Sequence, residues 1–230
     1  MRGVELGERG RCASLSAAVV AAVGSYLAEM VVLFTANAVW LLCFGFVVVL
    51  WAQSPIAALI FIPALSLPTA ALLGLAVVAA GGDSPRWSHL IQELPRRAVR
   101  KILLAGAQVA VFMLSASSLG IAGRIGGLVG VLSTLVAVYA VVALTMYALS
   151  LWPIICDPRR DGSLGQQLRL ALAVVLFRPL QLLSLGLITV MAVVASVQLM
   201  APLLFLPSLV LLVQAHYVVR VAGELSPVDG

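Results

Sequence analysis

The fold is decided by one stretch of the chain, residues 147–182, which reads YALSLWPIICDPRRDGSLGQQLRLALAVVLFRPLQL. This stretch carries four of the fourteen lysine and arginine residues, and a long apolar run lies on each side of it. A short basic segment between apolar runs is typical of a loop that leaves one membrane helix and leads into the next. The nature of the flanking runs therefore determines the fold class.

The apolar composition places the chain among membrane proteins. Hydrophobic residues make up 63% of the 230 residues and charged residues 10%. Soluble proteins average about 45–50% apolar residues and about 25% charged residues. The apolar runs continue for about twenty residues, which is enough for a helix to cross about 30 Å of hydrocarbon. Barrel strands would instead alternate over about 10 residues. The predicted fold class is all-α, a polytopic membrane helix bundle in which residues 1–230 form a single integral membrane domain.

We expect about six transmembrane helices and two interfacial helices on the cytoplasmic side. The transmembrane helices are predicted at about 30–51, 57–80, 102–122, 128–153, 180–198 and 201–219. The interfacial helices are predicted at about 84–95 and 163–178, and a juxtamembrane helix at 13–28. The last apolar run is too long for one helix and just long enough for two. A single tilted helix with a re-entrant segment is the alternative.

Each interfacial helix is predicted from its apolar periodicity. In the first, the apolar face is formed by Trp87, Leu90, Ile91 and Leu94, while Arg86, His89, Gln92 and Glu93 point elsewhere. In the second, Ser163 begins a helix whose apolar stripe is formed by Leu164, Leu168, Leu172 and Val175 or Leu176. Asp157 to Asp161 form a tight turn before it, and Arg178-Pro179 bends the chain back into the bilayer.

The positive charges indicate the orientation. With six spans and both termini inside, thirteen of the fourteen lysine and arginine residues lie in cytoplasmic segments and Arg124 lies outside. Basic residues concentrate on the cytoplasmic side of membrane proteins, and near the surface they also attract anionic head groups. We therefore expect the lipid bilayer to be the main partner, with Cys12 and Cys156 on the cytoplasmic side.

A few polar residues within the apolar runs are candidates for a site. Asn37 is expected to make a packing hydrogen bond between helices, with a substrate contact as the alternative. Glu29 is expected to be solvated at the start of a span rather than to be an intramembrane carboxylate. His216, which shares a helix face with Arg220 near Gln214, is expected to be interfacial, with proton handling as the alternative. Gln108 and Gln181 are expected to be packing groups or to reach the interface.

No pattern of catalytic or metal-binding residues is found. The chain has two histidines, and its three cysteines show no metal or redox spacing. It contains no phosphate-binding loop and no serine elbow motif. We therefore expect no enzyme, no cofactor and no metal site. Nucleic-acid binding is not expected either, because no soluble domain is present to offer a groove.

Three segments resemble the YesL-like family of bacterial integral membrane proteins, whose function is unassigned. They are NAVWLL at 37–42, PALSLPTAAL at 63–72, and the order Tyr147, Pro153, Asp157, Leu164, Ala171, Arg178-Pro179 in the opening stretch. In the second segment Ser66 replaces the family's threonine, and the spacing to Pro68 is one residue shorter. The following residues are candidates for a structural or partner-contact role: Asn37, Trp40, Pro63, Pro68, Trp87, Tyr147, Pro153, Asp157, Arg159, Arg160, Arg178 and Pro179.

The resemblance implies a multi-span protein of the bacterial plasma membrane, associated through genome context with carbohydrate uptake by ATP-driven transporters. The expected function is therefore accessory or regulatory, with the permease or ATPase subunits of such a transporter as partners. A sugar-class transporter or permease is the alternative. Residues 147–182 have two competing roles, an elbow that re-enters the membrane and, together with 84–95, a cytoplasmic platform for a partner. The sequence does not indicate the oligomeric state.

Overall fold

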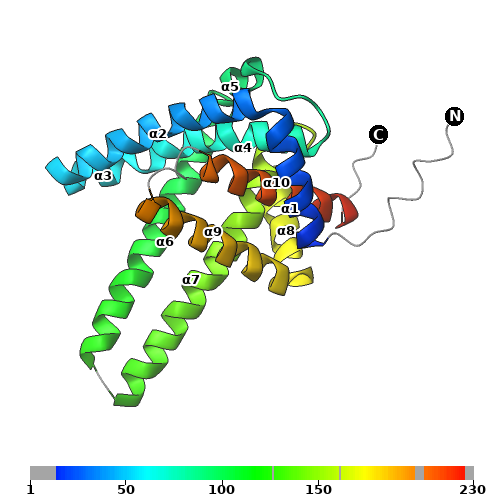
Figure 1. Cartoon of the computed structure of the whole chain (residues 1–230). Helices are drawn as coiled ribbons and strands as arrows, with labels where there is room; N and C mark the ends of the chain where they lie inside the picture. The colour runs from blue at the N-terminus through cyan, green and yellow to red at the C-terminus, as the bar shows by residue number, and fades with distance from the viewer. Residues whose placement is uncertain (1–13, 126, 161, 200–204, 226–230) are drawn as a thin grey trace, which may run out of the picture.

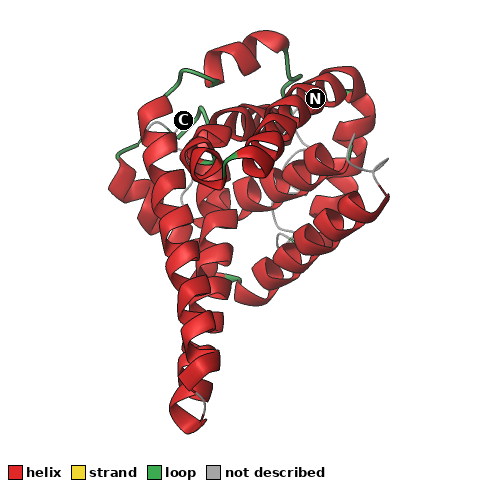
Figure 2. Cartoon of the chain, turned by 90° about the vertical axis from the view of Figure 1, so that its left-hand side faces the viewer, coloured by secondary structure: helices red, strands yellow, loops and turns green. Residues whose placement is uncertain are grey.

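The computed structural model describes residues 14–125, 127–160, 162–199 and 205–225. Within these ranges the ordered secondary structure is helical and contains no strand (Figure 2). Five of the described segments are long and apolar enough to cross a membrane, and the bent pair of helices at 164–195 would be a sixth. The predicted all-α helix bundle is confirmed, and the chain is a multi-pass membrane protein.

The helices follow one another closely along the chain. They are α1 (Leu15–Ala28), α2 (Met30–Gln53), α3 (Pro55–Phe61), a 3₁₀ turn (Pro63–Leu65), α4 (Ser66–Ala80), α5 (Trp87–Glu93), α6 (Ala98–Ile125), α7 (Gly127–Cys156), α8 (Leu164–Phe177), α9 (Pro179–Leu199) and α10 (Leu206–Leu225). Figure 1 shows the α2–α3 and α6–α7 hairpins leaving a shared core in different directions. The α6–α7 hairpin projects well beyond the other helices in both views.

The second apolar run, predicted as one span at 57–80, is broken near its two prolines. α3 ends at Phe61, and Pro63 opens the 3₁₀ turn. Pro68 lies in the first turn of α4, where its missing N–H costs no helical hydrogen bond. Thr69 then donates to the Leu65 carbonyl over 2.8 Å. The break is therefore built from residues that a helix tolerates at its ends.

The core is centred on α4 and α10. Nearly every residue from Ala70 to Val77 is buried, and a helix that is apolar all round is typical of the centre of a bundle. Gly74 brings α5 close, because a Cβ at this position would lie 2.9 Å from the Cγ of Glu93. α1 packs on α10 through Ala18, Ala22 and Tyr26. The predicted juxtamembrane helix is thus part of the core.

The last apolar run forms two helices, but the second lies further along the chain than predicted. α10 begins at Leu206 rather than at 201 and continues to Leu225 rather than ending at 219. Pro207 lies in its first turn, a position that suits proline. Arg220 therefore belongs to a helix and not to a tail. The predicted turn at 198–202 falls mainly outside the described residues.

The two predicted interfacial helices are present, and each packs on the bundle through part of its predicted apolar stripe and through residues outside that stripe. α8 begins after Ser163, whose hydroxyl accepts from Gln166 N while the Gln166 side chain accepts from Ser163 N. Its buried residues are Gln167, Ala171 and Val174, whereas Leu172 and Leu176 of the predicted stripe are exposed. In α5, Leu90 of the predicted apolar face is buried and Ile91 is 63% exposed, while Glu93, which is predicted to point elsewhere, is buried as well. α5 also begins at Trp87, three residues later than predicted.

Candidate functional site

The charged residues gather where α4, α5, α6, α7 and α8 meet, and we call this group the polar cluster. Its members are Asp83, Glu93, Arg96, Arg97, Arg100, Lys101, Asp157, Arg159, Arg160 and Gln167. Predicted candidates from the opening stretch, Asp157, Arg159 and Arg160, all belong to it. The remaining members come from the loop after α4, the end of α5, the link between α5 and α6, the first turn of α6, and, for Gln167, α8.

A buried ion pair forms the base of the polar cluster. Lys101 Nζ lies 2.7 Å from Glu93 Oε1 and also donates to the Glu93 carbonyl over 2.9 Å. The Lys101 side chain is 1% exposed and that of Glu93 10%. Arg96 Nη1 completes the group at 3.3 Å from Glu93 Oε2. Removing charges from water is costly, so a buried pair of this kind is stable only while both partners are present.

The polypeptide bends sharply between α5 and α6 to bring these residues together. Arg97 has a φ of +53°, a left-handed conformation that costs a residue other than glycine about 1–2 kcal/mol. Such strained residues persist where the surrounding structure holds them in place. Here the bend lets Lys101 fold back onto Glu93, eight residues earlier.

The loop after α7 is fixed to the same end of the bundle. Asp157 is 3% exposed, and its carboxylate accepts from Arg159 N over 3.0 Å and lies 3.3 Å from Arg160 Nε. Arg159 reaches across to the end of α4, where its Nη2 lies 2.7 Å from Asp83 Oδ2 and 3.1 Å from the Gly81 carbonyl. The predicted tight turn is therefore anchored by its own arginines, while Asp161 lies outside the described residues.

Gln167 connects this loop to α6. Its side-chain oxygen accepts from Arg100 Nη2, and its Nε2 donates to the Arg160 carbonyl over 2.8 Å. α5 packs on α4, whereas α8 packs on α7 and α10. The two interfacial helices are thus connected through the loop and the start of α6.

A second group of polar contacts lies within the apolar part of the bundle, around the predicted candidates Trp40 and Pro153. Trp40 Nε1 donates to Thr69 Oγ1 over 2.8 Å, and the Trp40 ring stacks on Phe44. Pro153 lies inside α7 and has no N–H to donate to the Leu149 carbonyl. Gln214 Nε2 on α10 donates to that carbonyl instead, over 2.8 Å. Pro153 and Gln214, which lie far apart in the sequence, are thus linked at the Leu149 carbonyl.

A cavity of about 290 Å³ adjoins this group. Its walls come from α2, α4, α9 and α10, and include Trp40, Thr69, Thr189 and Gln214 among apolar side chains. The hydroxyl hydrogens of Thr69 and Thr189 are donated to the Leu65 and Leu185 carbonyls. Because most polar groups of its wall are engaged within the protein, the cavity suits an apolar molecule better than a sugar.

The other candidates have structural contacts. Asn37 is fully buried in α2, the Tyr147 hydroxyl donates to the Leu168 carbonyl over 3.3 Å, and Trp87 is largely exposed on α5. At the elbow, α8 and α9 meet at a bend of 97°. Pro179 is the first residue of α9, and Arg178 lies 3.5 Å from Glu224.

Most of the remaining polar residues pack between helices. Glu29 separates α1 from α2, as expected for the start of a span. His216 is buried within the protein and shares a 3.0 Å hydrogen bond with Ser25 on α1. Gln108 accepts from Trp152 Nε1 over 3.0 Å and Gln181 accepts from the Tyr217 hydroxyl over 2.7 Å, which agrees with their predicted packing role.

No three histidine, cysteine, aspartate or glutamate side chains within the described ranges come together to hold a metal ion. Cys156, adjacent to the polar cluster, is fully buried, so a thiol reagent cannot be expected to report its side of the membrane. What the polar cluster provides is a rigid, charged surface.

The chain was compared with family models, with curated proteins and with solved structures, and none of them matches.

Proposed function

We propose that this chain is an accessory or regulatory protein of an ATP-driven carbohydrate uptake system, and that it docks a permease or ATPase subunit through α5. In this proposal it lies in the bacterial plasma membrane with both termini and the polar cluster in the cytoplasm. The assignment to the YesL-like family and the link to carbohydrate uptake rest on the sequence resemblance described above. The proposed docking surface rests on the outward face of α5.

Docking is supported by two apolar side chains that are exposed on the outer face of α5. Trp87 is 42% exposed and Ile91 63% exposed, and the exposed Arg86, Ser88 and Gln92 surround them. Tryptophan and arginine are enriched at protein interfaces, where an exposed aromatic residue with a polar rim often dominates the binding energy. The opposite side of the helix is held by Glu93 and Lys101. A partner would thus meet a preorganised surface, which lowers the entropic cost of binding.

A transporter is the second candidate, because the cavity between α2, α4, α9 and α10 could admit a ligand from the membrane. Its mostly apolar wall argues against a sugar, whose hydroxyls need hydrogen-bonding partners. Thermal unfolding of the purified chain with and without sugars separates the two proposals. Stabilisation by a sugar would favour the transporter.

Site-specific photo-crosslinking in cells tests the docking proposal. A photoreactive phenylalanine derivative replacing exposed Gln92 on α5 is expected to capture a permease or ATPase subunit, to be identified by mass spectrometry. The matched control carries the same group in place of Tyr139, which is 76% exposed on the projecting part of α7. Trp87→Ala in the Gln92 variant is expected to reduce the yield by at least about tenfold, since loss of an interface hot spot costs about 2 kcal/mol or more and each 1.4 kcal/mol is about tenfold in affinity.

Two results would contradict docking through α5. One is an equal yield of the same product from the control at Tyr139. The other is the absence of any transporter subunit from the product captured at Gln92.

A further inference from the structure

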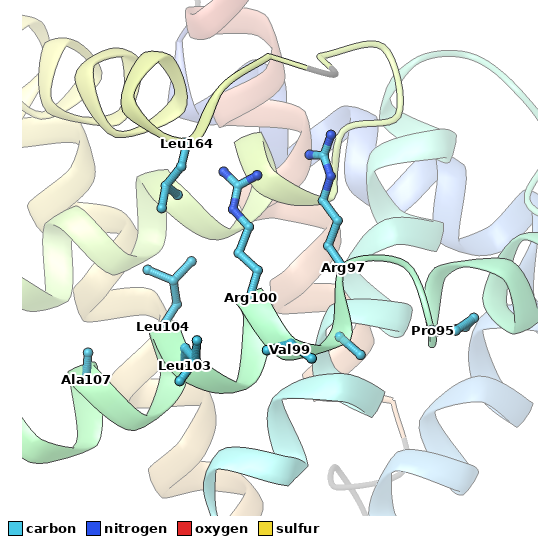
Figure 3. Close-up of a pocket in the computed structure, with 9 residues that line it drawn as sticks. Pro95, Arg97, Val99, Arg100, Leu103, Leu104, Ala107 and Leu164 are labelled. Carbon is cyan, nitrogen blue, oxygen red and sulfur yellow. The ribbon is translucent and has the colours of Figure 1, made fainter.

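A groove of about 670 Å³ runs along the first turns of α6, beside the polar cluster. Figure 3 shows the side chains of Arg97 and Arg100 extending to the same side of the helix, toward the loop that precedes α8. Apolar residues continue the groove down α6, and Leu164 faces them from the start of α8. One end of the groove is thus cationic and the rest is apolar.

The cationic end is built by the fold. Arg97 reaches its place through the left-handed backbone at the bend, and Arg100 is held by Gln167, which is itself 3% exposed. The described part of the polar cluster contains six cationic side chains and three carboxylates. This end therefore has an excess of positive charge, and two like charges lie side by side.

The apolar end belongs to a membrane-spanning helix. Val99 is 72% exposed and Leu103 67% exposed, and Leu104 and Ala107 extend the same wall. α6 is a candidate membrane span of which little is buried within the protein. Its exposed apolar residues thus face the hydrocarbon of the bilayer, directly below the two guanidinium groups.

We propose that this groove is a binding site for an anionic phospholipid. The phosphate lies between the guanidinium groups of Arg97 and Arg100, which bind phosphate through charge-assisted and often bidentate hydrogen bonds. One acyl chain follows Val99 and Leu103 along α6. A phospholipid fits both ends of the groove, whereas a soluble anion would leave its apolar part without contacts. The site is separate from the proposed docking face on α5.

Binding is measured on the purified full-length chain in mild detergent by native mass spectrometry. The probes are phosphatidylglycerol, phosphatidylcholine with the same acyl chains, and glycerol phosphate. Phosphatidylglycerol is expected to bind more tightly than phosphatidylcholine, and glycerol phosphate only weakly. Arg100→Gln and Arg97→Gly are each expected to lower the affinity for phosphatidylglycerol about fivefold, the equivalent of one basic residue near a membrane surface. Leu103→Asn is expected to lower it as well.

The variants are chosen so that a folding defect is not mistaken for lost binding. Glycine accepts the left-handed backbone without strain, which offsets part of the cost of losing the Arg97 side chain, so Arg97→Gly is expected to remain folded, as its thermal unfolding will show. Arg169→Gln removes the same charge from an exposed position on α8 and is expected to leave the affinity unchanged.

Several outcomes would overturn the proposal. Equal binding of the two lipids would show that charge does not select the ligand. An equal loss of affinity in Arg169→Gln would show a diffuse surface attraction and no site. Two results would indicate a site for soluble anions. One is that glycerol phosphate binds as tightly as the lipid. The other is that the arginine variants lose affinity for phosphatidylglycerol while Leu103→Asn keeps it.

Discussion

Lys101→Met is expected to lower the free energy of unfolding by about 3 kcal/mol, near the lower end of the cost of breaking a buried ion pair. The substitution leaves the Glu93 carboxylate buried, with Arg96 Nη1 at 3.3 Å from its Oε2. Lys101 also donates to the Glu93 carbonyl, so that acceptor loses its donor as well. Unfolding of the purified chain by titration with a denaturing detergent measures the change.

Two variants test whether the buried pair is the cause. Glu93→Gln combined with Lys101→Met removes both charges of the buried pair and is expected to recover most of the loss, because the cation that also contacts Glu93, Arg96, is 24% exposed and can be solvated. Arg159→Gln breaks the pair with Asp83, whose side chains are 47% and 68% exposed, and is expected to cost less than about 1 kcal/mol. If Lys101→Met cost no more than Arg159→Gln, the polar cluster would not have a buried ionic base.

Gln214→Leu is expected to destabilise the chain by about 1–3 kcal/mol, the cost of leaving a buried polar group without a partner. The group in question is the Leu149 carbonyl, to which Pro153 cannot donate and to which Gln214 Nε2 donates over 2.8 Å. No water is present in the bilayer core to replace the lost donor. The same detergent titration measures this change.

Pro153→Ala provides the decisive comparison, because alanine brings back the N–H that can donate to Leu149. In this background Gln214→Leu is expected to cost at least about 1 kcal/mol less than in the unmodified chain, a coupling typical of residues that share one hydrogen bond. Tyr217→Phe on the same helix removes the hydroxyl that donates to Gln181. Its change in the free energy of unfolding is expected to add to that of Pro153→Ala without coupling. Strict additivity of Pro153→Ala and Gln214→Leu would contradict the assignment.

The helices themselves follow from the sequence because their signals are local. The run at 30–51 predicts α2, and the break before α4 lies at Pro63 and Pro68, residue types that end or begin helices. The Ser163 cap and the Arg178-Pro179 elbow also form where residue type alone places them. Each of these features depends on side chains within a few positions of one another, and a single sequence carries that information.

The helix faces could not be predicted in the same way. An apolar stripe marks the packed face of a helix in water, whereas in a membrane the lipid is as apolar as leucine and small or polar residues pack between helices. α8 therefore buries Gln167 and Ala171 and exposes Leu172. The contacts of Glu93 with α4 at Gly74 and of Gln214 with Leu149 depend on chain packing between distant segments. No local pattern contains them.

The central claim of this account is that the polar cluster lies on the cytoplasmic side of the membrane and the α6–α7 turn on the other. Gln92→Cys and Arg124→Cys, made separately in a chain carrying Cys12→Ser and Cys43→Ser, test it with a membrane-impermeant maleimide. Cys156 is retained because it is fully buried. The account predicts that the Arg124→Cys variant is labelled in intact cells and the Gln92→Cys variant only in inside-out vesicles. Labelling of the Gln92→Cys variant in intact cells would contradict it.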